Sequence, residues 1–130
     1  MISRRGVIKN CLASLVAVKV PTSAFSAKNV SRYRIIAQKS EHQFYEGANL
    51  SDLFLYNGNS PGPLIVENKG NILEVEFLNL LDEPSSIHWH GIRNLNDMDG
   101  VPGLTQSPVE PGQTFTYRFP LNDAGTFWYH

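Results

Sequence analysis

The residues best suited to chemistry in this chain are two histidines, His88 and His90, with Trp89 between them. Side chains alternate between the two faces of a β-strand, so both imidazoles would point to one face and the indole to the other. Neutral imidazole is a good ligand for copper, zinc, iron and nickel. The spacing therefore predicts a short strand that carries a pair of metal ligands on one face and a large apolar anchor on the other.

A further candidate ligand, His130, ends the aromatic segment GTFWYH at 125–130, so three of the four histidines lie in two similar segments. The alternative reading is structural. Histidine is intermediate in burial, and a half-buried histidine is commonly satisfied by hydrogen bonds rather than by a metal. Two histidines two positions apart do not by themselves decide between these readings, so the surrounding sequence must.

Two carboxylates follow the histidine pair in a segment, 94–108, whose composition is typical of a loop. Asp97 is explained by turn chemistry, because an aspartate side chain readily bonds to nearby backbone groups. Asp99 is a candidate partner of the metal site, since carboxylates beside a metal orient its bound water or its imidazole ligands.

The elements that must position these residues are β-strands, because apolar residues recur with a period of two. Leu73, Val75 and Phe77 would face one way and Glu74 and Glu76 the other, which predicts a half-buried antiparallel strand. We therefore expect an all-β fold, a Greek-key β-sandwich of about seven short strands. The expected strands and extended runs are 33–37, 52–56, 64–66, 72–79, 86–91, 114–119 and 125–130.

The N-terminus has the three parts of an export signal. Arg4 and Arg5 form a twin-arginine pattern, an apolar run at 11–18 follows, and small residues near position 26 fit a cleavage site. The apolar run is too short for a membrane-spanning helix, which needs about 20 residues. We expect residues 1–26 to be a Tat-type signal peptide, with the Tat translocon as a partner during export and a periplasmic or extracellular location for residues 27–130.

The cysteine content and the charge exclude some kinds of metal site and of partner. The single cysteine, Cys11, lies inside the predicted signal, so the remaining segment has neither a disulfide nor a thiolate ligand. The chain has 11 Lys and Arg against 12 Asp and Glu, and four of the basic residues lie in the signal. The segment that remains is acidic and has no basic cluster, which argues against a nucleic-acid partner.

Five motifs occur in an order and at a spacing that resemble the multicopper oxidases, the family of the laccases and the bacterial copper-tolerance oxidases. They are NGNSPGP (57–63), SIHWHG (86–91), MDGVPG (98–103), PGQTFTY (111–117) and GTFWYH (125–130). The resemblance covers about residues 33–130. It implies a cupredoxin-like, or plastocyanin-like, Greek-key sandwich that is repeated two or three times in a full-length enzyme, of which residues 27–130 would be the N-terminal domain.

The resemblance also implies roles for individual residues and copper as the cofactor. His88 would bind the type 2 copper of a trinuclear cluster. His90 and His130 would each bind a type 3 copper. Asp99 would be a proton donor close to the cluster without binding copper itself.

The family's reaction couples four one-electron oxidations of a reducing substrate to the reduction of O2 to two waters. A phenol, an aromatic amine or Cu(I) would be the substrate. The other cluster histidines and the Cys-His-Met type 1 site would come from a later cupredoxin domain of the same parent chain. The family motif continues past His130, so we expect an N-terminal part of a longer enzyme, incomplete at its C-terminus and inactive alone.

Two other functions remain open at this point. The chain could be a non-catalytic periplasmic copper-binding module that uses the three histidines without turnover. It could also be a metal-free structural relative with the same scaffold, although the presence of His88, His90 and His130 weighs against that reading.

Overall fold

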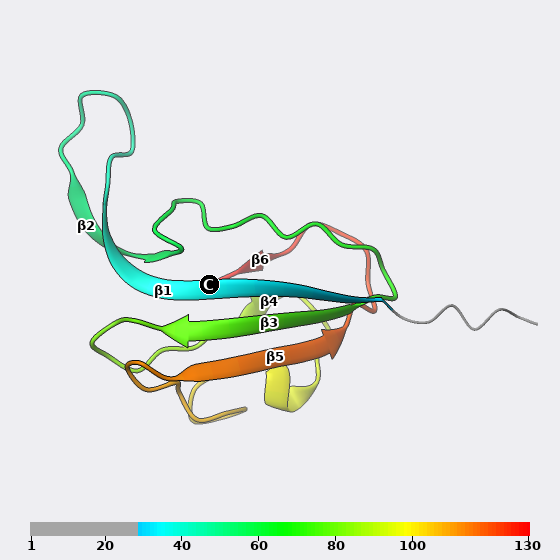
Figure 1. Cartoon of the computed structure of the whole chain (residues 1–130). Helices are drawn as coiled ribbons and strands as arrows, with labels where there is room; N and C mark the ends of the chain where they lie inside the picture. Colours follow the sequence, from blue (N-terminus) through cyan, green and yellow to red (C-terminus); the bar gives the residue numbers. More distant parts are fainter. Residues whose placement is uncertain (1–28) are drawn as a thin grey trace, which may run out of the picture.

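Six β-strands, joined by loops, form two sheets in the computed structural model, which describes residues 29–130 (Figure 1). The larger sheet has the order β2-β1-β3-β5 and the smaller one pairs β4 with β6. No helix of the described part is long and apolar enough to cross a membrane. The elements are β1 (Val30–His42), β2 (Ser51–Tyr56), β3 (Ile72–Asn79), β4 (Trp89–His90), the 3-10 helix η1 (Asn96–Met98), β5 (Thr114–Pro120) and β6 (Trp128–Tyr129). The predicted all-β class is confirmed, whereas the predicted signal peptide lies outside the described residues.

The larger sheet is mixed. β1 runs antiparallel to β2 and parallel to β3, and β3 runs antiparallel to β5. The predicted antiparallel pairing of segment 72–79 is therefore right at its β5 edge and wrong at its β1 edge. Alternation of apolar residues reports which face of a strand is buried, but not the direction of its neighbour. Parallel neighbours need a longer connection, and β2 with the segment that follows it supplies that connection here.

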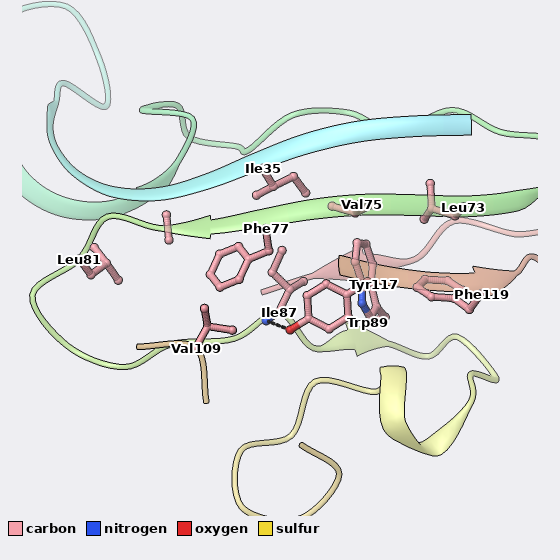
Figure 2. Packing of buried hydrophobic residues seen from close by; sticks show 11 residues of the cluster. Ile35, Leu73, Val75, Phe77, Leu81, Ile87, Trp89, Val109, Tyr117 and Phe119 are labelled. Atoms are coloured by element: carbon pink, nitrogen blue, oxygen red, sulfur yellow. Dashed lines mark hydrogen bonds between the residues drawn. The ribbon is translucent and has the colours of Figure 1, made fainter. Parts of the chain in front are cut away.

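The core lies between the two sheets, as Figure 2 shows. β3 contributes Val75 and Phe77, and β5 contributes Tyr117, all of them with no exposed surface. Trp89 reaches the same core from β4 and is only 2% exposed, with its ring centroid 5.6 Å from that of Tyr117. The Tyr117 hydroxyl accepts a hydrogen bond of 2.8 Å from the Ile87 N–H, which fixes the strand entry just before the histidine pair.

A fully buried asparagine, Asn79, connects the end of β3 to the loops around the site. Its side-chain amide donates to the carbonyls of Glu83 and Val109, each at 2.8 Å, and its side-chain oxygen accepts from the Leu81 N–H at 3.0 Å. Buried polar groups are costly unless they are hydrogen-bonded, and this one is bonded at both ends. Asn79 therefore fixes the path of the chain as it leaves β3 toward β4.

Two expected strands are shorter than predicted: segment 86–91 is a strand only at Trp89–His90, and segment 125–130 is a strand only at Trp128–Tyr129. Segment 64–66, predicted as a short extended run, belongs to no strand of the described residues. Just before this segment, the Pro63 carbonyl accepts a hydrogen bond of 2.7 Å from the Tyr129 hydroxyl. This side-chain contact connects the chain ahead of segment 64–66 to β6.

Tyrosines packed into the sandwich make its stability sensitive to alkaline pH. Burial raises the pKa of the Tyr56, Tyr117 and Tyr129 hydroxyls above the ordinary value of 10.0. A raised pKa means that the folded state holds the proton more tightly than the unfolded state. This stabilisation is complete below the unfolded pKa and is lost as the pH rises through the folded pKa. We expect the free energy of unfolding to fall above about pH 10, measured by urea denaturation followed by circular dichroism.

Two variants test the cause of that alkaline loss. Tyr56→Phe removes a hydroxyl whose pKa is raised, and it should make the decrease in stability with pH less steep. Tyr45→Phe removes a hydroxyl from a residue that is 73% exposed, so its slope should match that of the unaltered chain. An unchanged slope in the Tyr56 variant would show that another group controls alkaline unfolding.

Candidate metal centre

The histidine face is built by the pairing of β4 with β6. Trp89 lies opposite Tyr129, and His90 lies opposite Trp128. One step further, the His88 N–H donates to the His130 carbonyl at 2.8 Å, and the His130 N–H donates to the His88 carbonyl at 3.1 Å. Residues opposite each other in an antiparallel pair point to the same side. The register therefore places all three histidines on one face and turns Trp89 and Tyr129 toward the core.

The prediction of a shared histidine face is thus confirmed. One ring nitrogen from each of His88, His90 and His130 lies within 4.8 Å of the others. Two nitrogens bound at about 2 Å to a single ion can be at most about 4 Å apart. A cluster of this size can close on one ion after small side-chain rotations, or its rings can bind two neighbouring ions. Because all three donors are imidazole nitrogens, the cluster fits a metal such as copper.

His88 has its ring fixed by the loop that follows η1. Its Nδ1 lies 2.8 Å from the backbone carbonyl oxygen of Asp99, so Nδ1 carries the hydrogen and donates it. That tautomer leaves Nε2 unprotonated and available as a metal ligand. The Asp99 carboxylate is further away, with Oδ1 at 3.6 Å from the same nitrogen. The residue predicted from its carboxylate therefore contacts His88 mainly through its backbone.

The two predicted carboxylates have different places. Asp99 is about one-third exposed and lies at the edge of the histidine face, beside His88. Asp97 is exposed within the first turn of η1, and no side-chain hydrogen bond of Asp97 is present among the described residues, so its interpretation as a turn residue stays a prediction. Of the two predicted carboxylates, Asp99 is the one that the structure places next to a histidine of the cluster.

Gly100 brings the Asp99 loop against the histidine strand. Its φ is +80°, and a Cβ atom at this position would lie 1.6 Å from the Ile87 carbonyl oxygen. The Ser86 hydroxyl donates to the Gly100 carbonyl at 2.6 Å, which fixes the contact from the other side. The sequence motif around Gly100 indicated a turn, but it did not reveal that the turn packs on backbone next to His88.

Electrostatics favour the metal-binding form of His130. Desolvation of its ring, followed by the proximity of His88 and His90, lowers the pKa of His130 below its ordinary value of 6.5. An imidazole must be unprotonated to bind a metal. The three rings therefore hold His130 in the form that binds.

One residue of the site was missed by reasoning from sequence. Trp128 lies on the histidine face, where its ring stacks on His90 at 4.6 Å between centroids and on His130 at 4.4 Å. Its side chain is 57% exposed. A signal was present, since Trp128 precedes His130 by two positions and strand alternation places such residues on one face.

Comparison with known proteins identifies the family. The family model described as multicopper oxidase matches residues 37–130. The chain belongs to the multicopper oxidase family. Its similarity to individual members agrees with this, because Laccase-1 of Emericella nidulans is 46% identical over 86 residues, which are 65% of this chain and 14% of that protein.

A bacterial relative aligns over more of the sequence. Copper resistance protein A of Escherichia coli is 34% identical over 137 aligned residues, covering 98% of this chain and 23% of that protein. The chain thus spans less than a quarter of the length of either relative.

Solved structures confirm the fold. The multi-copper oxidase from Pseudomonas thermotolerans superimposes with a TM-score of 0.76 at 42% identity, covering 80% of this chain and 25% of that chain. The blue copper oxidase from Nitrosomonas europaea gives a TM-score of 0.75 at 36% identity, with coverage of 78% and 32%. The fold is therefore that of the cupredoxin domains of multicopper oxidases, as the sequence motifs predicted.

Proposed function

We propose that this chain is the N-terminal copper-binding domain of a multicopper oxidase and contributes His88, His90 and His130 to a trinuclear copper cluster. The observation that carries the proposal is the convergence of one nitrogen from each ring within 4.8 Å on one face of the β4–β6 pair. Copper bound there would supply one-electron chemistry and reduction of O2 to water. The protein's own contribution is to hold three unprotonated imidazoles in place.

The roles of the three ligands are taken from the resemblance to the multicopper oxidases. By that resemblance we assign His88 to the type 2 copper and His90 and His130 to the type 3 pair. In the structure His88 is held by a hydrogen bond to the Asp99 carbonyl, whereas His90 and His130 both stack on Trp128. The two ligands assigned to the type 3 pair therefore share one aromatic neighbour.

Asp99 is the proposed proton donor of the site. Its carboxylate lies at the edge of the histidine face and is 31% exposed, so it can exchange protons with solvent. Its backbone carbonyl is meanwhile engaged with His88. Asp99 would therefore hold or release a proton at a carboxylate oxygen beside the cluster while its main chain fixes a ligand.

The rest of the oxidase site must come from elsewhere. A type 1 copper site needs a cysteine thiolate, and the only cysteine in this sequence is Cys11. His90 and His130 are both exposed, so their face is open to another protein surface. We propose a later cupredoxin domain of the same parent chain as that partner. O2 and a phenol, an aromatic amine or Cu(I) would be the co-substrates of the complete enzyme.

Export is part of the same proposal. Residues 1–26 would direct the protein through the Tat translocon and be removed, leaving a domain that begins at residue 27 in the periplasm or outside the cell. The twin arginines Arg4 and Arg5 and the short apolar run after them support this assignment.

A second candidate function is copper binding without turnover. The observation that favours it is that three ligands from this chain alone already converge. Such a module would bind and release copper but would not consume O2. The two functions therefore differ in what a complete parent chain does, not in what this domain binds.

The function is tested by separating copper binding from turnover. We expect the copper-loaded chain to consume no O2 with a phenol, an aromatic amine or Cu(I), because residues 27–130 contain no cysteine that could supply the thiolate for electron entry. An O2 electrode provides the measurement, and a His88→Ala, His90→Ala variant corrects for copper in solution. Uptake above that control would contradict the need for another domain. Failure of the unaltered chain to bind copper would contradict both candidate functions.

A further inference from the structure

We propose that Trp128 is a positioning residue that sets the ring planes of His90 and His130 for metal binding. The inference rests on the proposed copper site. The indole lies 4.6 Å from the His90 ring at an interplanar angle of 30°, and 4.4 Å from the His130 ring at 26°. One rigid aromatic plane thus contacts both candidate ligands.

Core packing does not account for this stacking. Trp128 points away from the core and is 57% exposed, whereas Trp89, the other tryptophan of the chain, is 2% exposed and anchors β4. The angle between the rings of Trp89 and Tyr117 is 77°, the edge-on geometry common in protein cores. Trp128 is instead nearly parallel to both imidazoles. An exposed indole in this geometry is held by the rings that it contacts.

The three histidines differ in what else could orient them. Metal-binding histidines usually donate their second ring nitrogen to a carbonyl or carboxylate, and this bond fixes the ring. His88 has such a bond to Asp99. In the described part of the chain, neither His90 nor His130 makes a side-chain hydrogen bond that could do the same, and Trp128 stacks on both of these rings. Stacking therefore takes the place of the missing hydrogen bond.

The register explains why a single residue can support both rings. Trp128 is directly opposite His90 in the β4–β6 pair and two positions before His130, which follows directly after β6. Cross-strand neighbours and residues two apart on one strand share a face. The position between the two histidines is therefore the one from which a large ring reaches both.

The experiment compares Trp128→Leu with Trp128→Phe in Cu(II) titrations of the whole chain. Leucine removes the aromatic face, and we expect about a tenfold loss of affinity, as for other groups that orient metal ligands. Phenylalanine keeps a stacking face and should retain most of the affinity. Electron paramagnetic resonance of the bound Cu(II) should show a broadened signal in the leucine variant, which a merely structural role would not produce in a folded protein.

Two controls make the result decisive. Phe54→Leu changes another exposed aromatic strand residue, 54% exposed on β2, and should leave copper affinity unchanged. Cu(II) should quench the exposed Trp128, the tryptophan that remains in a Trp89→Phe variant, more strongly than the buried Trp89, the tryptophan that remains in a Trp128→Phe variant.

Copper binding by the leucine variant equal to that of the unaltered chain would overturn the inference while leaving the proposed function intact. Equal losses in the leucine and phenylalanine variants would also overturn it. If the leucine variant fails to fold, absence of preferential Trp128 quenching overturns the inference and its presence supports it. No copper binding by the unaltered chain would overturn the proposed function and the inference together.

Discussion

Removing the imidazoles of both His88 and His90 is expected to abolish specific copper binding. The His88→Ala, His90→Ala variant keeps one of three converging ligands and should bind Cu(II) at least about a hundredfold more weakly than the unaltered chain. Both side chains lie on the face that points away from the core. Trp89 would stay buried in the core on the other face, so the fold should be retained. Competition with a chelator of known affinity near pH 7 measures the loss.

His42 provides the matched control. It ends β1 and its ring packs edge-on against Phe44 at 5.0 Å rather than on the cluster. His42→Ala should therefore leave tight copper binding unchanged. Equal affinities for the double variant and the unaltered chain would show that His88 and His90 are not ligands, and the two residues would then be structural histidines.

Substitution of Gly100 is expected to have the largest effect on stability. A Cβ atom would lie 1.6 Å from the Ile87 carbonyl oxygen, and that oxygen belongs to the backbone that leads into His88. Overpacking and the positive φ each cost about 1–3 kcal/mol. We expect Gly100→Ala to lower the free energy of unfolding by about 3 kcal/mol or more. It should also weaken copper binding, because the Asp99 carbonyl would be displaced from His88. Urea denaturation and copper titration measure the two effects.

Gly103→Ala separates the steric effect from the conformational one. Its φ is +73°, close to the +80° of Gly100, but no atom lies within 4 Å of the position that a Cβ would occupy. This variant should lose only about 1–2 kcal/mol from backbone strain and keep its copper affinity. Similar losses at both positions would mean that the loop at Gly100 moves freely away from Ile87.

The sequence predicted the parts of the fold that depend on alternation within one strand. The inward side chains of β3 and the opposite faces of Trp89 and the histidines follow from a period of two, and the structure confirms both. Alternation carries no information about partners. Alternation therefore could not predict that β1 pairs in parallel with β3 or that segment 64–66 is unpaired.

In the site, too, the sequence indicated residue types but not the contacts that these residues make. Asp99 was recognised as a carboxylate, but its closest contact with His88 is made by a main-chain carbonyl, which every residue has. The contribution of Gly100 is the absence of a side chain next to Ile87. Contacts of this kind depend on how two loops meet in space, and a single sequence does not encode them in any recognisable residue type.

Because His88 pairs with His130, we expect the histidine cluster to assemble late in folding. The two residues exchange backbone hydrogen bonds although one lies before η1 and β5 and the other follows both. Contacts between residues so distant along the chain form slowly, because the intervening loop must lose entropy before any bond repays it. In a polypeptide that is still disordered the imidazoles are far apart, so the proposed copper ion would bind chains in which β4 and β6 have already paired. Metal binding would then shift the folding equilibrium by mass action and report that β6 is in place.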